Sequence, residues 1–333
     1  MQKGAFRNSL QERYVSHLAA LILAGSSVVS PTMPVQTYVE ATGPSGSLKG
    51  TMLSPSTAGA PVILMIPGSG PVDRDGNSPQ GLKAASLKLL AEGLAANGIA
   101  TVRIDKRGMY ASAAATPDAN AVTISGYAAD VHSWATSIRH QTGAKCIWVL
   151  GHSEGGLVAL AAGRASSDIC GLVLVSAAGR PVGAVLAEQL KANPANAPIL
   201  DQALSAITEL EAGRHVDPAK LNPALLPLFR PAVQDFLIDE MTLDPAKLIA
   251  SFHKPVLILQ GERDIQVSVE DARLLKQANP AAKLVLLPDT NHLLKTVASD
   301  DRGTNVATYA DPSLPLAPNV VSSIADFVNS GGQ

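Results

Sequence analysis

Short, largely apolar runs alternate with amphipathic stretches along most of this sequence. The runs lie at residues 61–66, 100–105, 146–151, 172–175, 255–259 and 283–287. Continuous runs of this kind are typical of strands that are buried on both faces of a sheet. Helical spacing of apolar residues predicts helices at 84–96, 126–140, 157–163, 270–278 and 319–328. The alternation predicts an α/β fold with a mainly parallel sheet and helices on both faces.

The first part of the chain has a different pattern. Residues 36–41 and 48–53 are strand-like and flank a turn rich in glycine, proline and serine at 43–46. We therefore expect an antiparallel hairpin before the parallel sheet begins.

Strand-like runs stop after Arg180 and resume at Pro255. Residues 181–252 carry helical patterns instead, and prolines divide them into short pieces. A helical insertion between two sheet strands is most simply a cap. The predicted organisation is an α/β core at 36–180 and 253–330, with a helical cap at 181–252.

The N-terminus resembles a secretory signal. Lys3, Arg7 and Arg13 precede an apolar run at 18–24, and small residues follow at 25–27. The run is too short to span a bilayer, which needs about 20 residues, so no stable membrane insertion is expected. We predict a signal peptide at 1–30 and a periplasmic or secreted protein. A frayed amphipathic helix on a cytoplasmic protein is the alternative.

Composition and charge are those of an ordinary globular protein. Apolar residues make up 46% and charged residues 16%, with a net charge of −2 and no basic stripe, which argues against nucleic acid as a partner. Aromatic residues are only 4%, so we expect a pocket lined by aliphatic side chains and a small-molecule ligand. Because the cysteines lack metal-ligand spacing and no dinucleotide fingerprint follows the first sheet strand, no metal or organic cofactor is expected.

The two cysteines open neighbouring predicted strands. Cys146 precedes one and Cys170 the other, and adjacent strands lie about 4.8 Å apart. A disulfide is possible at that distance, and so is a pair of buried thiols.

A possible nucleophile lies between the strand at 146–151 and the helix that follows. Gly151-His-Ser-Glu-Gly155 has the pattern G-x-S-x-G. Between a strand and a helix this pattern forms a sharp turn that exposes the serine hydroxyl. The helix N-terminus then directs N–H groups at developing negative charge. We predict Ser153 as the nucleophile.

Sheet topology selects the partners of Ser153. Functional residues of a parallel sheet lie just beyond the carboxyl ends of its strands. Of seven histidines, only His292 follows a strand and is free of the serine turn, so it is the predicted base. Asp264 follows the strand at 255–259 and is the predicted acid. Glu262 is a weaker candidate, and Asp289 is more typical of a turn residue.

Two backbone N–H groups are expected to form an oxyanion hole. One belongs to Glu154, directly after the nucleophile, and the other to Ser69 in the loop after the first sheet strand. The charged residues Asp73, Arg74 and Asp75 in that loop either orient it or contact substrate, and we favour orientation.

These residues together resemble the α/β-hydrolase superfamily, and more narrowly the bacterial carboxylesterases of the serine-aminopeptidase-like (Hydrolase_4) group. The resemblance covers about residues 36–330. Its most specific stretch is 66–77, and further motifs lie at 48–51, 105–108, 151–156, 261–264 and 291–292. It implies the α/β-hydrolase fold and a catalytic triad, which maps onto Ser153, Asp264 and His292. The chain departs from the group's pattern at Met109 and Tyr110.

The sequence therefore predicts a serine hydrolase that cleaves small to medium carboxylic esters through an acyl-enzyme on Ser153. A peptidase or amidase, or an acyltransferase, is the alternative on the same residues. A hydrolase-like binding protein without turnover is a third hypothesis, which the complete set of residues disfavours.

Overall fold

An eight-stranded sheet forms the centre of the protein, in a computed structural model that describes residues 33–165 and 167–333. The predicted signal peptide at 1–30 lies outside these residues. The strand order is β1-β2-β4-β3-β5-β6-β7-β8. The strands are β1 (Val35–Thr42), β2 (Ser47–Ser54), β3 (Val62–Ile66), β4 (Ala100–Ile104), β5 (Ile147–His152), β6 (Ile169–Val175), β7 (Val256–Gly261) and β8 (Lys283–Leu287).

Of the eight strands, only β2 runs in the opposite direction to the others. The strands β1 and β2 form an antiparallel hairpin, β2 pairs antiparallel with β4, and all later pairs are parallel. The predicted α/β fold and hairpin are confirmed. Parallel pairing places the carboxyl ends of β3 to β8 at one edge of the sheet, and the loops that carry the candidate residues begin at this edge.

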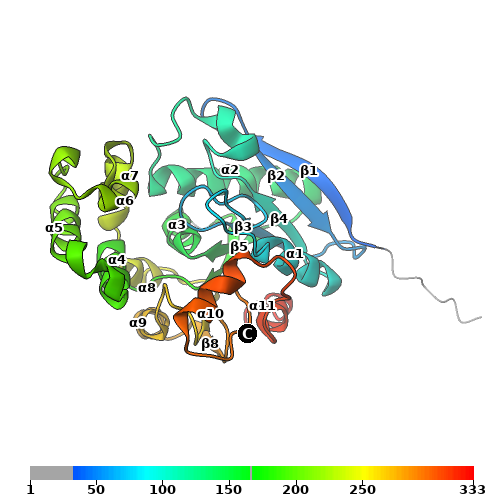
Figure 1. Cartoon of the computed structure of the whole chain (residues 1–333). Helices are drawn as coiled ribbons and strands as arrows, with labels where there is room; N and C mark the ends of the chain where they lie inside the picture. The colour runs from blue at the N-terminus through cyan, green and yellow to red at the C-terminus, as the bar shows by residue number, and fades with distance from the viewer. Residues whose placement is uncertain (1–32, 166) are drawn as a thin grey trace, which may run out of the picture. The chain divides into compact units, whose positions relative to one another are not determined.

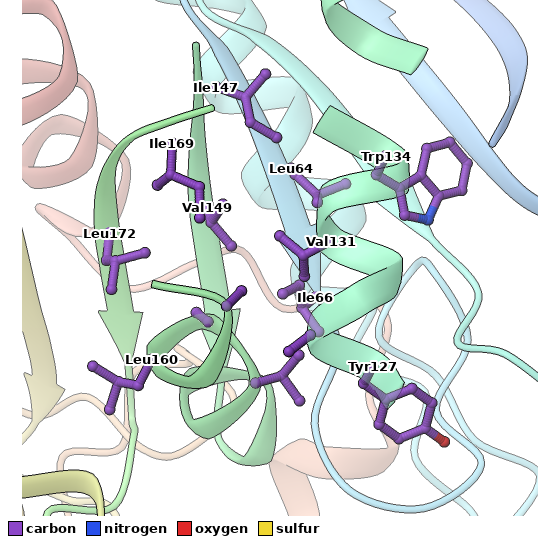
Figure 2. Packing of buried hydrophobic residues seen from close by; sticks show 14 of the residues in the cluster. Leu64, Ile66, Tyr127, Val131, Trp134, Ile147, Val149, Leu160, Ile169 and Leu172 are labelled. Carbon is purple, nitrogen blue, oxygen red and sulfur yellow. The ribbon is translucent and has the colours of Figure 1, made fainter. Parts of the chain in front are cut away.

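Helices cover both faces of the sheet (Figure 1). The sheet helices are α1 (Ser86–Ala96), α2 (Ile124–Thr142), α3 (Glu154–Ala162), α9 (Val269–Ala278) and α11 (Val320–Asn329). Residues of α1 and α11 pack with Ile63 and Met65 of β3, whereas residues of α2, α3 and α9 pack with Leu64 and Ile66. This alternation follows from the two-residue period of a strand. Figure 2 shows α2 and α3 against β3, β5 and β6.

Local backbone chemistry explains where the helices begin. The predicted helix at 84–96 starts two residues late, at Ser86, because Ala85 has a left-handed conformation with φ 49°. The helix α2 starts earlier than predicted, where the Thr123 side chain accepts a hydrogen bond from the Gly126 N–H. The short helix α10 (Arg302–Ala307) was not predicted, because its residues lack apolar periodicity.

The segment predicted as a cap is helical, with no strand among its residues 181–252, all of which are described. Its helices are α4 (Val182–Ala192), α5 (Leu200–Glu211), α6 (Leu226–Phe229), α7 (Pro231–Met241) and α8 (Pro245–Ala250). Apolar residues of α4 to α7 form a hydrophobic cluster of their own. In Figure 1 these four helices group at one side of the sheet. We keep the name cap for residues 181–252.

Cys146 and Cys170 are joined by a disulfide, with their Cα atoms 5.2 Å apart. The bond links the start of β5 to the start of β6, at the sheet edge opposite the candidate site. Of the two possibilities that the sequence left open, the structure has the disulfide. Among residues 33–165 and 167–333, no helix is long and apolar enough to cross a membrane.

Candidate active site

Ser153 lies at the apex of a strained turn between β5 and α3. Its backbone has φ 55° and ψ −122°, a conformation that a residue with a Cβ rarely adopts. The chain closes on itself so tightly that a Cβ added at Gly151 would lie 2.0 Å from the carbonyl oxygen of Gly155. Glycine at 151 is therefore a steric requirement of the turn.

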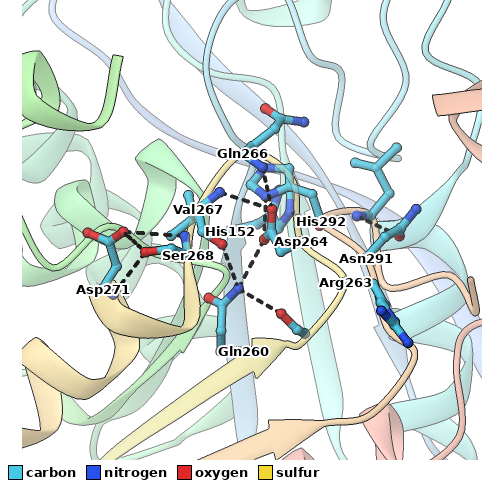
Figure 3. Close-up of polar contacts among 12 residues, drawn as sticks. His152, Gln260, Arg263, Asp264, Gln266, Val267, Ser268, Asp271, Asn291 and His292 are labelled. Carbon is cyan, nitrogen blue, oxygen red and sulfur yellow. Dashed lines mark hydrogen bonds and ion pairs between the residues drawn. The ribbon is translucent and has the colours of Figure 1, made fainter. Parts of the chain in front are cut away.

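His292 and Asp264 meet beyond the ends of β7 and β8. The Nδ1 atom of His292 lies 2.8 Å from Oδ2 of Asp264, and the two side chains are 4% and 0% exposed (Figure 3). A carboxylate at this position fixes the ring orientation and the tautomer with the proton on Nδ1. The other ring nitrogen, Nε2, is left as a proton acceptor.

Asp264 is held by four hydrogen bonds. Its Oδ1 accepts from the backbone N–H groups of Gln266 and Val267, at 2.8 and 3.0 Å. Its Oδ2 accepts from the Gln260 side chain at 3.1 Å as well as facing His292. Burial alone would raise the pKa of Asp264, but His292 and the two N–H groups stabilise the charged form, so the pKa lies below its ordinary value. The carboxylate is thus kept ionised and rigid. The contribution of Gln260 had no sequence signal, and β7 continues through this residue although the predicted strand ended at 259.

The alternative acids lie elsewhere. Glu262 and Asp289 are both exposed. Asp289 faces Arg263, with 3.4 Å between its Oδ1 and the arginine Nε, and has a left-handed backbone with φ 49°. Asp289 is a turn residue, and neither residue contacts His292.

His152 connects the serine turn to the histidine loop. Its Nε2 lies 2.8 Å from the carbonyl oxygen of His292, and the two rings are tilted with centroids 4.8 Å apart. Because a carbonyl only accepts, His152 carries its proton on Nε2. Burial and the nearby His292 lower the pKa of His152 to about 4, so the ring is neutral at neutral pH. The sequence excluded His152 as the base, and the structure gives it a positioning contact that no pattern indicated.

The structure thus brings the three predicted residues into one region, with Asp264 and His292 in direct contact. Ser153 directly follows His152, which contacts His292 by both its ring and its hydrogen bond. Within residues 33–165 and 167–333, the Ser153 hydroxyl makes no hydrogen bond. Contacts between a nucleophile and its base are often long without substrate and tighten in the reacting complex.

The two predicted oxyanion donors belong to segments next to Ser153. Glu154 is the first residue of α3, and the leading N–H groups of a helix have no partner within it. Ser69 is exposed in the loop after β3, whereas Gly68 is buried. A Cβ added at Gly68 would lie 3.2 Å from the Cβ of Ser153, so this loop approaches the serine closely.

The charged residues of the same loop are bonded to protein groups. The backbone N–H and the guanidinium of Arg74 both donate to the Asp105 carboxylate, at 3.0 and 2.5 Å, and Arg74 also donates to Thr51 at 2.9 Å. Asp73 accepts from two N–H groups of its own loop, and Asp75 pairs with Arg103. These contacts support the favoured interpretation, in which Asp73, Arg74 and Asp75 orient the loop.

The two residues that depart from the group's pattern lie near the same loop. The Tyr110 hydroxyl donates to the carbonyl of Pro71, although the tyrosine remains 43% exposed. Tyr110 therefore supports the loop from outside, in addition to the charged network.

The cap helix α7 packs against the sheet helix α2. The Asp239 side chain accepts from the Ile124 N–H at the start of α2 at 2.8 Å, and Phe236 packs edge-on against Tyr127. Glu240 is buried at 5% exposure. Burial and the charge of Glu154 raise the pKa of Glu240 well above its ordinary value. The described residues hold no group of three or more histidine, cysteine or carboxylate side chains that would suit a metal ion.

Comparison with known proteins agrees with this architecture. Est1E from Butyrivibrio proteoclasticus superposes with a TM-score of 0.54 at 17% identity, covering 89% of this chain and 98% of that one. An esterase from Pyrococcus furiosus, Pf2001, gives a TM-score of 0.55 at 18% identity over 90% and 92% of the two chains. The chain has the α/β-hydrolase fold.

Sequence comparison finds two further likenesses, one to a protein family and one to an esterase. The family of serine aminopeptidases, S33 (Hydrolase_4), matches residues 83–222. Esterase EstD of Thermotoga maritima is 26% identical over 268 residues, which is 78% of this chain. The match spans only 60% of EstD.

Proposed function

We propose that this protein is a serine carboxylesterase that cleaves small to medium carboxylic esters. The observation that carries the proposal is the buried contact between His292 and Asp264, next to a strained serine turn at the carboxyl edge of the sheet. The likeness to EstD and to esterase structures supports ester hydrolysis over other acyl transfers.

In the proposed mechanism, Ser153 Oγ attacks the ester carbonyl while His292 Nε2 accepts the hydroxyl proton. The oxyanion is bound by the N–H groups of Ser69 and Glu154. Collapse of the intermediate expels the alcohol, which takes the proton from His292, and leaves an acyl group on Ser153. Water then attacks the acyl-enzyme by the same route and releases the acid. Asp264 orients His292 and stabilises its charged form without taking the proton.

The cap is proposed to select the substrate. Its helix α7 contacts the start of α2, and Glu154 is near enough to Glu240 of α7 to raise the pKa of Glu240. The cluster of the cap is built from leucine, isoleucine, alanine and valine with a single methionine and a single phenylalanine. An aliphatic cap of this kind suits short acyl or alkyl groups. The proposed partner is therefore a small ester, with neither nucleic acid nor a cofactor involved.

The test is release of p-nitrophenol from acetate, butyrate and octanoate esters, with Ser153→Ala as the control. A serine-reactive phosphonate should label wild type at Ser153 and leave the variant unlabelled. If wild type is inert and unlabelled, the protein is a binding module and the proposal fails. Faster turnover of p-nitroanilides than of matched esters would indicate a peptidase or amidase. Transfer of the acyl group to added alcohol or amine in preference to water would indicate an acyltransferase.

We also propose that the protein is exported to the periplasm or secreted. The support is the charge and apolar order of residues 1–30 together with the Cys146–Cys170 disulfide, which persists in oxidising compartments. N-terminal sequencing of the protein from its producing cells should find the chain beginning after residue 24. A mature protein that retains Met1 and fractionates with the cytoplasm would contradict export.

A further inference from the structure

Lys106 is a buried cation that the proposed mechanism does not use. It follows β4 directly after Asp105 and is 3% exposed. Its Nζ donates to the carbonyl oxygen of Gly68 at 2.7 Å and lies 2.9 Å from Oε1 of Glu154. Its third neighbour is the ring of Tyr127, with the centroid 5.4 Å away. A buried ammonium needs such partners, because an unpaired charge is costly in the interior.

The first partner of Lys106 belongs to the peptide unit that carries one oxyanion donor. The Gly68 carbonyl and the Ser69 N–H lie in the same planar trans peptide and point in opposite directions. An ammonium that holds the carbonyl on one side therefore fixes the N–H on the other. Within residues 33–165 and 167–333, the Ser69 N–H has no hydrogen-bond partner, so the bond from Lys106 to the Gly68 carbonyl is the hydrogen bond that holds this peptide unit.

The second partner of Lys106 is the side chain of the residue that carries the other donor. The Glu154 carboxylate is 4% exposed and is held by Lys106 at the start of α3. The single ammonium thus joins the loop after β3 to the N-terminus of α3. It also balances a carboxylate that would otherwise oppose negative charge developing on the substrate.

We propose that Lys106 is a positioning residue that keeps the Ser69 and Glu154 N–H groups in the relative positions needed to bind the oxyanion. This inference rests on the proposed function, because it assigns Lys106 a part in stabilising the same oxyanion. Its contribution should appear in the transition state and not in substrate binding, since Lys106 acts on the substrate only through the Ser69 and Glu154 N–H groups.

The rival explanation is that Lys106 only neutralises Glu154. Replacing Lys106 alone would leave a buried, unpaired carboxylate and destabilise the fold, whatever its role in catalysis. The double variant Lys106→Met/Glu154→Gln separates the two explanations. The double variant removes both charges, so no unpaired carboxylate remains to destabilise the fold. The Gly68 carbonyl still lacks its hydrogen-bond donor.

The experiment compares wild type, Lys106→Met, the double variant and Lys88→Met, which alters an exposed lysine paired with Glu92. Folding is followed by thermal melting, and the active fraction by phosphonate titration. The kinetic readouts are kcat and KM for p-nitrophenyl butyrate and the inhibition constant of an alkyl trifluoromethyl ketone, which forms a hemiketal oxyanion on the serine.

Loss of one oxyanion donor costs about 100- to 1,000-fold in kcat, and misplacing donors should cost about 10- to 100-fold. We expect kcat per active site to fall about 10- to 100-fold in both Lys106 variants. KM should change less than about threefold, and the affinity for the ketone should weaken in parallel with kcat. The double variant should keep the defect even where its melting temperature returns to that of wild type, and Lys88→Met should match wild type.

Recovery of kcat and ketone affinity in the double variant would overturn the proposal and leave Lys106 as a counter-ion for Glu154. A change in KM with kcat unchanged would also overturn the proposal. A wild-type protein that neither turns over esters nor reacts with phosphonate would instead remove the proposed function, and this inference with it.

Discussion

His152, the residue before the candidate nucleophile, donates a hydrogen bond from Nε2 to the carbonyl oxygen of His292, the candidate base, at 2.8 Å. The serine turn and the histidine loop are therefore joined by a bond that takes no part in proton transfer. The backbone of His292 is fixed from the β5 side by His152, while its ring is fixed from the β7 side by Asp264.

Replacing His152 by phenylalanine should keep the ring contact and remove this bond. We expect kcat for p-nitrophenyl esters to fall about tenfold, corresponding to roughly 1 kcal/mol for a buried hydrogen bond. The rate of phosphonate labelling of Ser153 should fall with it. The exposed His140, changed in the same way, is the matched control and should behave as wild type. Equal labelling rates for the two variants would show that the bond is dispensable.

The same histidine should make the fold sensitive to acid. Its pKa is lowered from 6.5 to about 4 in the folded protein, so the unfolded chain binds the proton more tightly. The contribution of the neutral His152 to the free energy of unfolding is fully present above pH 6.5. It is lost as the pH falls from 6.5 towards 4, by up to about 3 kcal/mol. Urea unfolding across this range should show a shallower decline for His152→Phe than for wild type. Parallel curves for the two proteins would contradict the assignment.

Asp264 should be the acid that orients His292. Asp264→Asn keeps the size of the side chain but offers a donor where His292 Nδ1–H needs an acceptor, so kcat should fall by about 10⁴. Asp289→Asn, at the exposed turn near His292 in sequence, is the matched control and should stay within about threefold of wild type. A larger loss for Asp289→Asn than for Asp264→Asn would reverse the assignment.

Glu240 should make the cap more stable in acid than in base. Its pKa is raised well above the ordinary value of 4.5 by burial and by Glu154, so the folded state holds the proton more tightly than the unfolded chain. The contribution of protonated Glu240 to the free energy of unfolding is fully present below pH 4.5. It is lost as the pH rises towards the pKa of Glu240 in the folded protein. Glu240→Gln keeps a neutral side chain at every pH.

The melting temperature of Glu240→Gln should therefore exceed that of wild type by a margin that grows from pH 4.5 to 8. Glu92→Gln, on the surface of α1, should show no such trend. A constant margin for Glu240→Gln would mean that Glu240 is ionised in the folded protein.

The disulfide should contribute about 3 kcal/mol to the free energy of unfolding, because it closes a loop between residues 24 apart in sequence. Replacing Cys146 and Cys170 by serine should lower the midpoint of urea unfolding accordingly. Because the bond lies at the sheet edge away from Ser153, kcat at 25 °C should be unchanged. Detection of two free thiols in native, unreduced protein would contradict the bond.

The fold class and the principal side chains of the candidate site could be predicted without the structure. Buried parallel strands are continuous apolar runs, and the glycines around Ser153 are sterically required, so both leave clear local patterns. Because the carboxyl ends of parallel strands meet at one edge, His292 and Asp264 could be selected from strand positions alone, and the contact between them agrees with that selection.

The contacts that support these residues could not be predicted and are seen in the folded protein. The contacts of Lys106 with Gly68 and Glu154, of His152 with His292, and of Gln260 with Asp264 join residues from different strands or loops. The spacing of residues in the sequence does not predict these contacts, because each contact depends on where two strand ends lie in space. The same holds for the disulfide. Until the order of the strands is known, Cys146 and Cys170 can be either a disulfide or two buried thiols. The α7 contacts with α2 also depend on packing between segments more than 100 residues apart in sequence.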